Sequence, residues 1–195
     1  MRAVQLTGVV LAGGLGSRLG GDKPGALLAG RPLISYPLAA LRGACPRVAV
    51  VCKRSTVLPA LGRGVERWEE PDEPRHPAAG VAHALQRAGG SVLVCAADMP
   101  FVSAGDCRRL AAAAAGAPEA STVVAEAAGW LQPTFAVYRP AALPALRACG
   151  HAQLTRVVEA LAPSLVAFPG DPLRSVDTPE ALVAAERELG RGEGA

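Results

Sequence analysis

The chain has 195 residues, of which 50% are apolar and 4% aromatic, and its formal net charge is +3. This length suits one domain, expected over residues 1–189 with a disordered tail at 190–195, and the small charge argues against a nucleic-acid partner. No leader sequence or long apolar run stands out, and the five cysteines form no CxxC pair, so we expect a cytoplasmic protein with free thiols and no membrane contact.

Apolar runs and helical periodicity alternate along the chain. The pattern predicts strands at 5–11, 48–51, 91–97, 121–126, 134–138 and 165–168, and helices at 32–41, 76–88, 106–115, 153–161 and 179–189. Strands that are apolar without alternation are typical of a mostly parallel sheet covered on both faces, so the fold class is α/β. Such sheets bind ligands beyond the carboxyl ends of their strands, which points to the segments after Leu11 and Ala97.

The segment after the first strand reads LAGGLGSRLGGDK, from Leu11 to Lys23. Its glycines allow tight turns that bring backbone N–H groups close to phosphate oxygens, and Arg18 and Lys23 add two cations. Together they could hold a triphosphate and neutralise the charge of a departing pyrophosphate. The spacing is not that of a P-loop, and Leu19 stands where a dinucleotide-binding GxGxxG motif has its last glycine.

Asp98 follows the apolar run 92–97 and precedes Met99 and Pro100. A carboxylate at this edge of the sheet faces the ligand crevice, and Mg²⁺ is commonly held by one or two carboxylates together with phosphate oxygens. We therefore expect Asp98 to be a Mg²⁺ ligand, although an aspartate here could also serve as a turn former.

The LAGGxGSRxGxDK loop, together with Asp98, resembles the signature of the molybdenum cofactor guanylyltransferases. The resemblance implies a three-layer Rossmann-like nucleotidyltransferase fold with a mostly parallel mixed sheet. It also implies catalytic roles for Arg18, Lys23 and Asp98. An acidic residue that meets the guanine or ribose would be Glu70 or Asp72, in a region that could equally be a solvated loop. The nucleotide-binding set is then Leu11, Ala12, Gly13, Gly14, Ser17, Arg18, Lys23, Glu70, Asp72 and Asp98.

Similarity to this family extends over about residues 6–189. The segments 31–33, 77–80, 132–139 and 175–180 resemble its GKPL, GPLAG, QPLFALYR and NTPED elements. By resemblance the acceptor-binding residues are Gln132, Pro133 and Asp177. The last segment also has a local interpretation, because Thr178 and Pro179 are typical of a helix start.

The resemblance implies transfer of GMP from GTP to molybdenum-molybdopterin, with release of pyrophosphate and Mg²⁺ as cofactor. Partners would be GTP, the molybdopterin cofactor, and proteins of molybdenum cofactor synthesis or apo-molybdoenzymes. Asp177 stands where this family usually has Asn and is more typical of molybdopterin cytidylyltransferases. A cytidylyltransferase, another small-acceptor nucleotidyltransferase and a non-catalytic nucleotide-binding module therefore remain alternatives.

Overall fold

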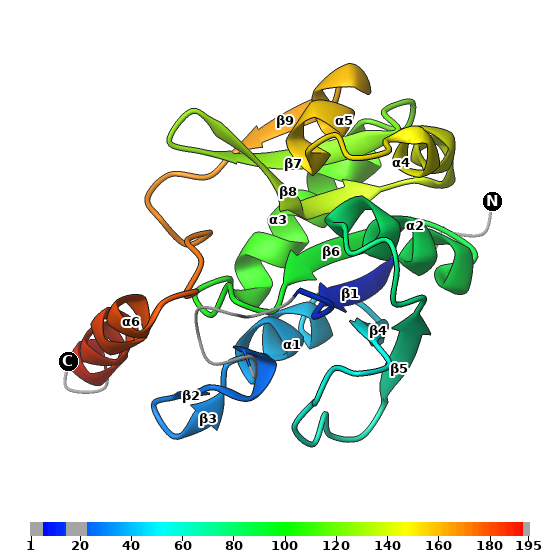
Figure 1. Cartoon of the computed structure of the whole chain (residues 1–195). Helices are drawn as coiled ribbons and strands as arrows, with labels where there is room; N and C mark the ends of the chain where they lie inside the picture. The colour runs from blue at the N-terminus through cyan, green and yellow to red at the C-terminus, as the bar shows by residue number, and fades with distance from the viewer. Residues whose placement is uncertain (1–5, 15–22, 193–195) are drawn as a thin grey trace.

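A seven-stranded sheet forms the centre of the computed structural model, which describes residues 6–14 and 23–192 (Figure 1). The strand order is β5-β4-β1-β6-β8-β7-β9. The strands are β1 (Thr7–Leu11), β4 (Arg47–Lys53), β5 (Val65–Glu70), β6 (Val92–Ala96), β7 (Thr122–Ala127), β8 (Trp130–Tyr138) and β9 (Ser164–Ala167). Within the sheet β8 runs antiparallel to its neighbours β6 and β7, and the other pairings are parallel, which confirms the mostly parallel mixed sheet.

Helices cover both faces of the sheet and make the three layers expected from the sequence (Figure 1). On one face α1 (Ser35–Arg42) and α3 (Ala104–Gly116) bury residues such as Leu41 and Leu110. On the other face α2 (Pro77–Ala88), α4 (Leu143–Ala148) and α5 (Leu154–Ala160) bury residues such as Val81, Leu146 and Val158. The central strands are apolar on both sides because both faces are covered.

The C-terminal helix α6 (Pro179–Gly192) packs beside the short hairpin β2 (Leu27–Leu28) and β3 (Arg31–Pro32) (Figure 1). Leu28, Leu33, Val176 and Ala185 form a small separate core there. The Thr178 hydroxyl accepts a hydrogen bond from the Ala181 N–H at 3.2 Å, which confirms the helix start expected at this threonine. Ahead of α6, the Val176 N–H donates to the Asp98 carbonyl at 2.8 Å and ties this last segment to the end of β6.

The sequence did not predict β5, α4, the two strands of the β2–β3 hairpin, or the short 3-10 helices η2 (Lys23–Gly25) and η3 (Pro140–Ala142). In addition, β8 begins four residues before the predicted strand, and α6 continues to Gly192, beyond the predicted helix end at 189. The cysteines are free thiols as expected, and burial raises the pKa of Cys45 to about 11 and of Cys107 to about 12. In the ranges that the structure describes, no helix is long and apolar enough to span a membrane.

Candidate functional site

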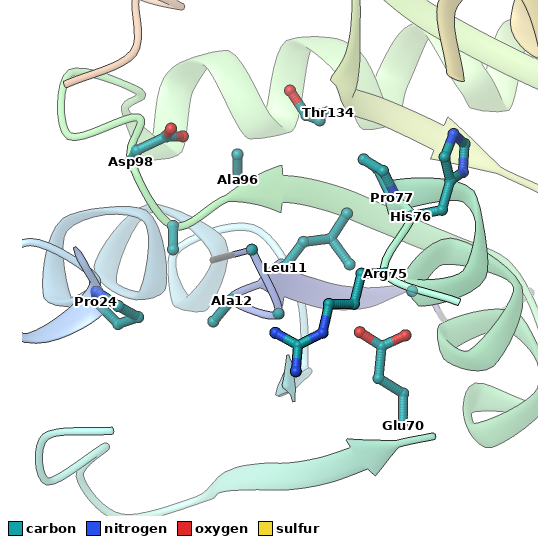
Figure 2. Close-up of a pocket in the computed structure, with 14 residues that line it drawn as sticks. Leu11, Ala12, Pro24, Glu70, Arg75, His76, Pro77, Ala96, Asp98 and Thr134 are labelled. Carbon is teal, nitrogen blue, oxygen red and sulfur yellow. The ribbon is translucent and has the colours of Figure 1, made fainter. Parts of the chain in front are cut away.

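A cavity of about 240 Å³ opens at the carboxyl edge of the sheet, where β1, β5 and β6 end (Figure 2). Two backbone hydrogen bonds fix this edge, from the Ala12 N–H to the Val51 carbonyl at 2.8 Å and from the Ala97 N–H to the Leu11 carbonyl at 3.1 Å. The residues that line the cavity are Leu11, Ala12, Gly13, Gly14, Pro24, Glu70, Arg75, His76, Pro77, Gly80, Ala96, Ala97, Asp98 and Thr134. The site thus lies where an open α/β sheet is expected to bind its ligand.

Asp98 and Glu70 are the two carboxylates of this cavity, and Figure 2 shows them on opposite sides of Leu11 and Ala12. Asp98 comes directly after β6, whereas Glu70 is the last residue of the edge strand β5. Two acids so placed suit a ligand that has an anionic part, bound through a metal ion at one acid, and a part that donates hydrogen bonds to the other.

Glu70 is buried, and the Lys53 Nζ lies 3.4 Å from its Oε1 atom. Burial raises the pKa of the Glu70 carboxyl, and the neighbouring Lys53 ammonium partly offsets that rise. Of the two alternatives left open for residues 69–72, the solvated loop is therefore wrong for Glu70. Its residue type suggested exposure, but its place at the end of a strand buries it.

Gly13 lies directly against the Glu70 carboxylate. A Cβ atom at position 13 would stand 2.5 Å from Glu70 Oε1, closer than non-bonded atoms approach, so the absence of a side chain allows this contact. Gly80, in the first turn of α2, is also near this carboxylate, and its Cβ would be 3.6 Å from Glu70 Oε2 and 3.3 Å from a Leu11 methyl group. The missing side chain at Gly13 thus leaves the space that the carboxylate occupies, whereas at Gly80 the tighter contact is with Leu11.

Helix α2 begins at the wall of the cavity. The His76 Nδ1 accepts a hydrogen bond from the Ala78 N–H at 3.1 Å and caps the helix, and Pro77 occupies its first turn. The positive end of the helix dipole is therefore directed at the site, and Arg75 adds a cation to the same wall. No chemistry was expected of His76 from the sequence, although a polar residue before Pro77 is a recognisable capping signal.

Of the residues predicted to bind nucleotide, six line the cavity: Leu11, Ala12, Gly13, Gly14, Glu70 and Asp98. Asp72 is exposed and lines a second cavity, of about 890 Å³, whose wall Glu70 and His76 share with the first. Ser17 and Arg18 lie outside the described residues. Lys23 begins the short helix η2 (Lys23–Gly25), whose Pro24 lines the cavity, but the Lys23 side chain is also outside the description.

The predicted acceptor residues lie close to this edge but do not line the cavity. Gln132 and Pro133 are in the first half of β8, and the following residue, Thr134, reaches the cavity instead. Pro133 is buried, and its carbonyl accepts a hydrogen bond from the Tyr138 hydroxyl at 2.7 Å. Asp177 follows Val176, whose N–H is bonded to the Asp98 carbonyl, so the backbone brings Asp177 near Asp98.

The donor set at Asp98 fits a hard cation that takes most of its oxygen ligands from a bound phosphate. Its carboxylate supplies oxygen, the atom Mg²⁺ prefers, and Mg²⁺ usually needs one or two protein carboxylates. Among the residues that the structure describes, no three His, Cys, Asp or Glu side chains are grouped to hold a metal by themselves. The residues present therefore match a site shared between protein and ligand better than an all-protein cage.

Comparison with known proteins gives a consistent result. Residues 8–165 match the model of the MobA-like NTP transferase domain. A molybdenum cofactor guanylyltransferase of Rhodobacter capsulatus is 32% identical over 199 residues, which cover 95% of this chain and 97% of that protein.

Two solved structures show the same fold. The molybdopterin-guanine dinucleotide biosynthesis protein A of Archaeoglobus fulgidus has a TM-score of 0.74 at 24% identity, covering 95% of this chain and 100% of that one. The 2-C-methyl-D-erythritol 4-phosphate cytidylyltransferase of Thermus thermophilus has a TM-score of 0.70 at 24% identity, covering 95% and 99%. On the strength of the family model and the Rhodobacter relative, the chain belongs to the MobA-like NTP transferase family and is a nucleotidyltransferase.

Proposed function

We propose that this nucleotidyltransferase moves the GMP part of GTP onto the terminal phosphate of a molybdopterin cofactor, with release of pyrophosphate. The observation that carries this proposal is that Asp98 and Glu70 lie on opposite sides of Leu11 and Ala12, in one cavity at the carboxyl edge of the sheet (Figure 2). The similarity to a molybdenum cofactor guanylyltransferase over nearly the whole chain supports the choice of nucleotide and acceptor.

In this proposal the glycine turn and the start of α2 bind the nucleotide. The backbone N–H groups after Leu11 donate to phosphate oxygens, and Glu70 accepts hydrogen bonds from the base or ribose. A carboxylate can accept from the N1–H and the 2-amino group of guanine together, a pair of donors that cytosine and adenine do not offer side by side. Glu70, rather than Asp72, is then the acidic nucleotide contact.

The acceptor phosphate attacks the α-phosphorus of GTP, and the bond from that phosphorus to the bridging oxygen of pyrophosphate breaks. The acceptor oxygen is already ionised near neutral pH, so the protein's task is in-line positioning and charge neutralisation. Asp98 would hold Mg²⁺, which when bound neutralises charge on the phosphate oxygens. Arg18 and Lys23 of the glycine loop would stabilise the departing pyrophosphate.

The direct test is pyrophosphate release from GTP, CTP, ATP and UTP in turn, each with MgCl₂ and molybdenum-loaded molybdopterin. Release with GTP alone is the expected result. Preference for CTP would retain the phosphate chemistry but assign the protein to the cytidylyl branch, which the aspartate at position 177 favours. If none of the four nucleotides reacts, the proposed reaction is wrong.

A further inference from the structure

Lys53 is a buried cation at the end of β4, next to Glu70 and Gly13 of the cavity wall. Its side chain is 4% exposed, and its Nζ atom donates to the Pro71 carbonyl at 2.6 Å and to the Pro74 carbonyl at 3.1 Å. The same Nζ lies 3.4 Å from Glu70 Oε1. An ammonium group has three N–H donors, and here three acceptors surround it. Lys53 is thus fully engaged within the protein.

The next residue along the chain offers a contrast. Arg54 is 86% exposed, and its Nε lies 3.9 Å from an oxygen of Glu69, which is itself half exposed. Burying a charge costs several kcal/mol in desolvation, and a buried ion pair is often no more stabilising than apolar residues of the same volume. A contribution to stability therefore does not explain why the Lys53–Glu70 pair is buried. The position of Glu70 in the cavity wall suggests that the pair serves ligand binding.

We propose that Lys53 is a positioning residue for nucleotide selection, which keeps Glu70 ionised and aimed into the cavity. The proposal rests on the proposed function, in which Glu70 accepts two hydrogen bonds from the guanine edge. Oε1 can accept from both Lys53 and a ligand, because each carboxylate oxygen has two lone pairs. A protonated Glu70 would turn one of its oxygens into a donor and lose the match to guanine.

Lys53 also anchors the segment that joins β5 to α2. Pro71 begins this connection and Pro74 lies near its end, and Lys53 binds the carbonyl of each. Arg75 and His76 follow directly and line the cavity. One ammonium group therefore fixes a carboxylate and the course of the backbone that carries two more wall residues. The second effect needs hydrogen-bond donors but not a charge, which separates the two roles experimentally.

Glu70 shares its two cavity walls with titratable and charged groups from several segments, among them Arg54, Glu69, Asp72, Glu73, Arg75, His76, His83, Asp98, Arg147 and His151. Lys53 belongs to β4, Arg75 and His76 precede α2, and His83 lies on α2 with a pKa lowered by burial and by the charges of Arg87 and Lys53. Lowering that pKa favours neutral His83 at pH 7, so His83 does not replace the charge of Lys53. Burial already raises the Glu70 pKa, and loss of the Lys53 charge should raise it further.

The experiment measures kcat/KM for GTP from pH 5 to pH 9 in Lys53→Met, Lys53→Gln and Lys53→Arg, with the exposed Arg54→Met as matched control. For Lys53→Met we expect the KM for GTP to rise about 10- to 100-fold at pH 7, with kcat at saturation nearly unchanged. The acidic limb of the profile should move to higher pH, because Glu70 must lose its proton to bind. Lys53→Gln, which can still donate to the carbonyls, should show the same shift as Lys53→Met. Lys53→Arg keeps the charge and should show only a small shift from the wild-type profile. The control Arg54→Met should leave the wild-type profile unchanged.

A double variant shows whether Lys53 acts through Glu70. In a Glu70→Gln background nothing titrates at position 70. The double variant, which adds Lys53→Met, should therefore have the same pH profile, and the same ratio of GTP to ATP affinity, as Glu70→Gln alone. A full additional loss in that background would overturn the proposal, and so would an unchanged acidic limb in folded Lys53→Met or Lys53→Gln. If the wild type releases no pyrophosphate, the proposed function fails separately, and the same variants are compared by calorimetric binding of GTP with MgCl₂. GTP affinity that does not respond to Lys53 substitution, or no GTP binding at all, would then overturn this inference.

Discussion

Strands β4 and β5 carry one ion pair at each end. Where the strands begin, Arg47 donates to Glu66 at 2.6 and 2.9 Å, and both side chains are more than 40% exposed. Where the strands end, Lys53 and Glu70 are about 5% exposed and 3.4 Å apart. In the parallel register Lys53 lies directly opposite Glu70. Glu66 instead lies opposite Ala49, and Arg47 reaches it diagonally, so the two pairs differ in register as well as in exposure.

The pKa values of the two glutamates are shifted in opposite directions. Hydrogen bonds from Arg47 and Trp68 lower the pKa of Glu66 to about 2, whereas burial raises the pKa of Glu70 despite its lysine. The exposed pair requires little desolvation, and solvent screens its attraction. The buried pair requires the desolvation of two charges beside the cavity. Perturbed ionisation of the second kind is typical of functional sites.

The largest effect should come from the other carboxylate of the cavity. Asp98→Asn should reduce transfer by at least about 10³-fold, because a bound metal ion supplies several kcal/mol of charge stabilisation. The matched control is Asp106→Asn, since Asp106 belongs to the capping box of α3 with Ser103 and should affect stability by about 1 kcal/mol without affecting transfer. Pyrophosphate release and thermal unfolding measure both quantities. Near-wild-type transfer by Asp98→Asn would disprove the metal assignment.

A direct test of the two ion pairs replaces each glutamate with alanine. Glu70→Ala should lower the free energy of unfolding by about 3–5 kcal/mol, because it leaves the Lys53 charge buried without its carboxylate. Glu66→Ala should cost about 1 kcal/mol or less, since Arg47 can turn to water. Urea unfolding at pH 7 gives both values, and equal losses would contradict the distinction drawn between the two ends.

Gly13→Ala should displace the carboxylate of the buried Lys53–Glu70 pair without removing any charge. The new Cβ would stand 2.5 Å from Glu70 Oε1, so the carboxylate must move away from its present position. We expect the KM for GTP to rise about tenfold through this misplacement. Gly90→Ala, where a Cβ meets no atom within 4 Å, is the control, and steady-state kinetics at pH 7 distinguish the two. A Gly13→Ala enzyme with unchanged KM would show that the position of Glu70 matters little.

The smallest effect is the dependence of stability on pH at the exposed end. Because the folded pKa of Glu66 is lowered to about 2, its contribution is present above about pH 4.5 and is lost as the pH falls towards 2. Solvent screening keeps this contribution below about 1 kcal/mol. Glu70 has the opposite sign: its raised pKa favours the folded state at low pH, and this contribution is lost as the pH rises through the folded pKa. The free energy of unfolding of wild type, Glu66→Gln and Glu70→Gln is measured between pH 2 and 7. Relative to wild type, the two substitutions should change its dependence on pH in opposite directions.

The sequence was sufficient to predict the sheet and the edge at which the site lies. Uninterrupted apolar strands such as β4 and β6 are recognisable because both faces of the sheet are covered, and the glycines after β1 and Asp98 after β6 mark the strand ends. The edge strand β5 was missed because its sequence, VERWEE, is mostly charged, and its two buried residues, Trp68 and Glu70, alternate with exposed ones.

The environment of Lys53 could not be predicted from local sequence. Its carbonyl partners at Pro71 and Pro74 lie 18 and 21 residues away along the chain and are brought close by the pairing of β4 with β5. Thr134 was likewise hidden, because the predicted strand began at this residue, whereas β8 starts four residues earlier and bulges nearby. The roles of Arg18, Lys23 and the acceptor residues remain predictions.

The hydrogen bond from the Val176 N–H to the Asp98 carbonyl has a consequence for the order in which the site is completed during synthesis. Ribosomes deliver the chain from its amino end, and early segments can begin to fold before late ones emerge. Leu11 to Gly14, Lys53, Glu70 and Asp98 all precede residue 100, so most of the cavity wall is synthesised before Thr134 and the C-terminal segment. The backbone partner of Asp98 arrives with the last tenth of the chain, together with the helix that closes over the β2–β3 hairpin. A chain that stalls late on the ribosome would therefore lack the hydrogen bond from the Val176 N–H to the Asp98 carbonyl.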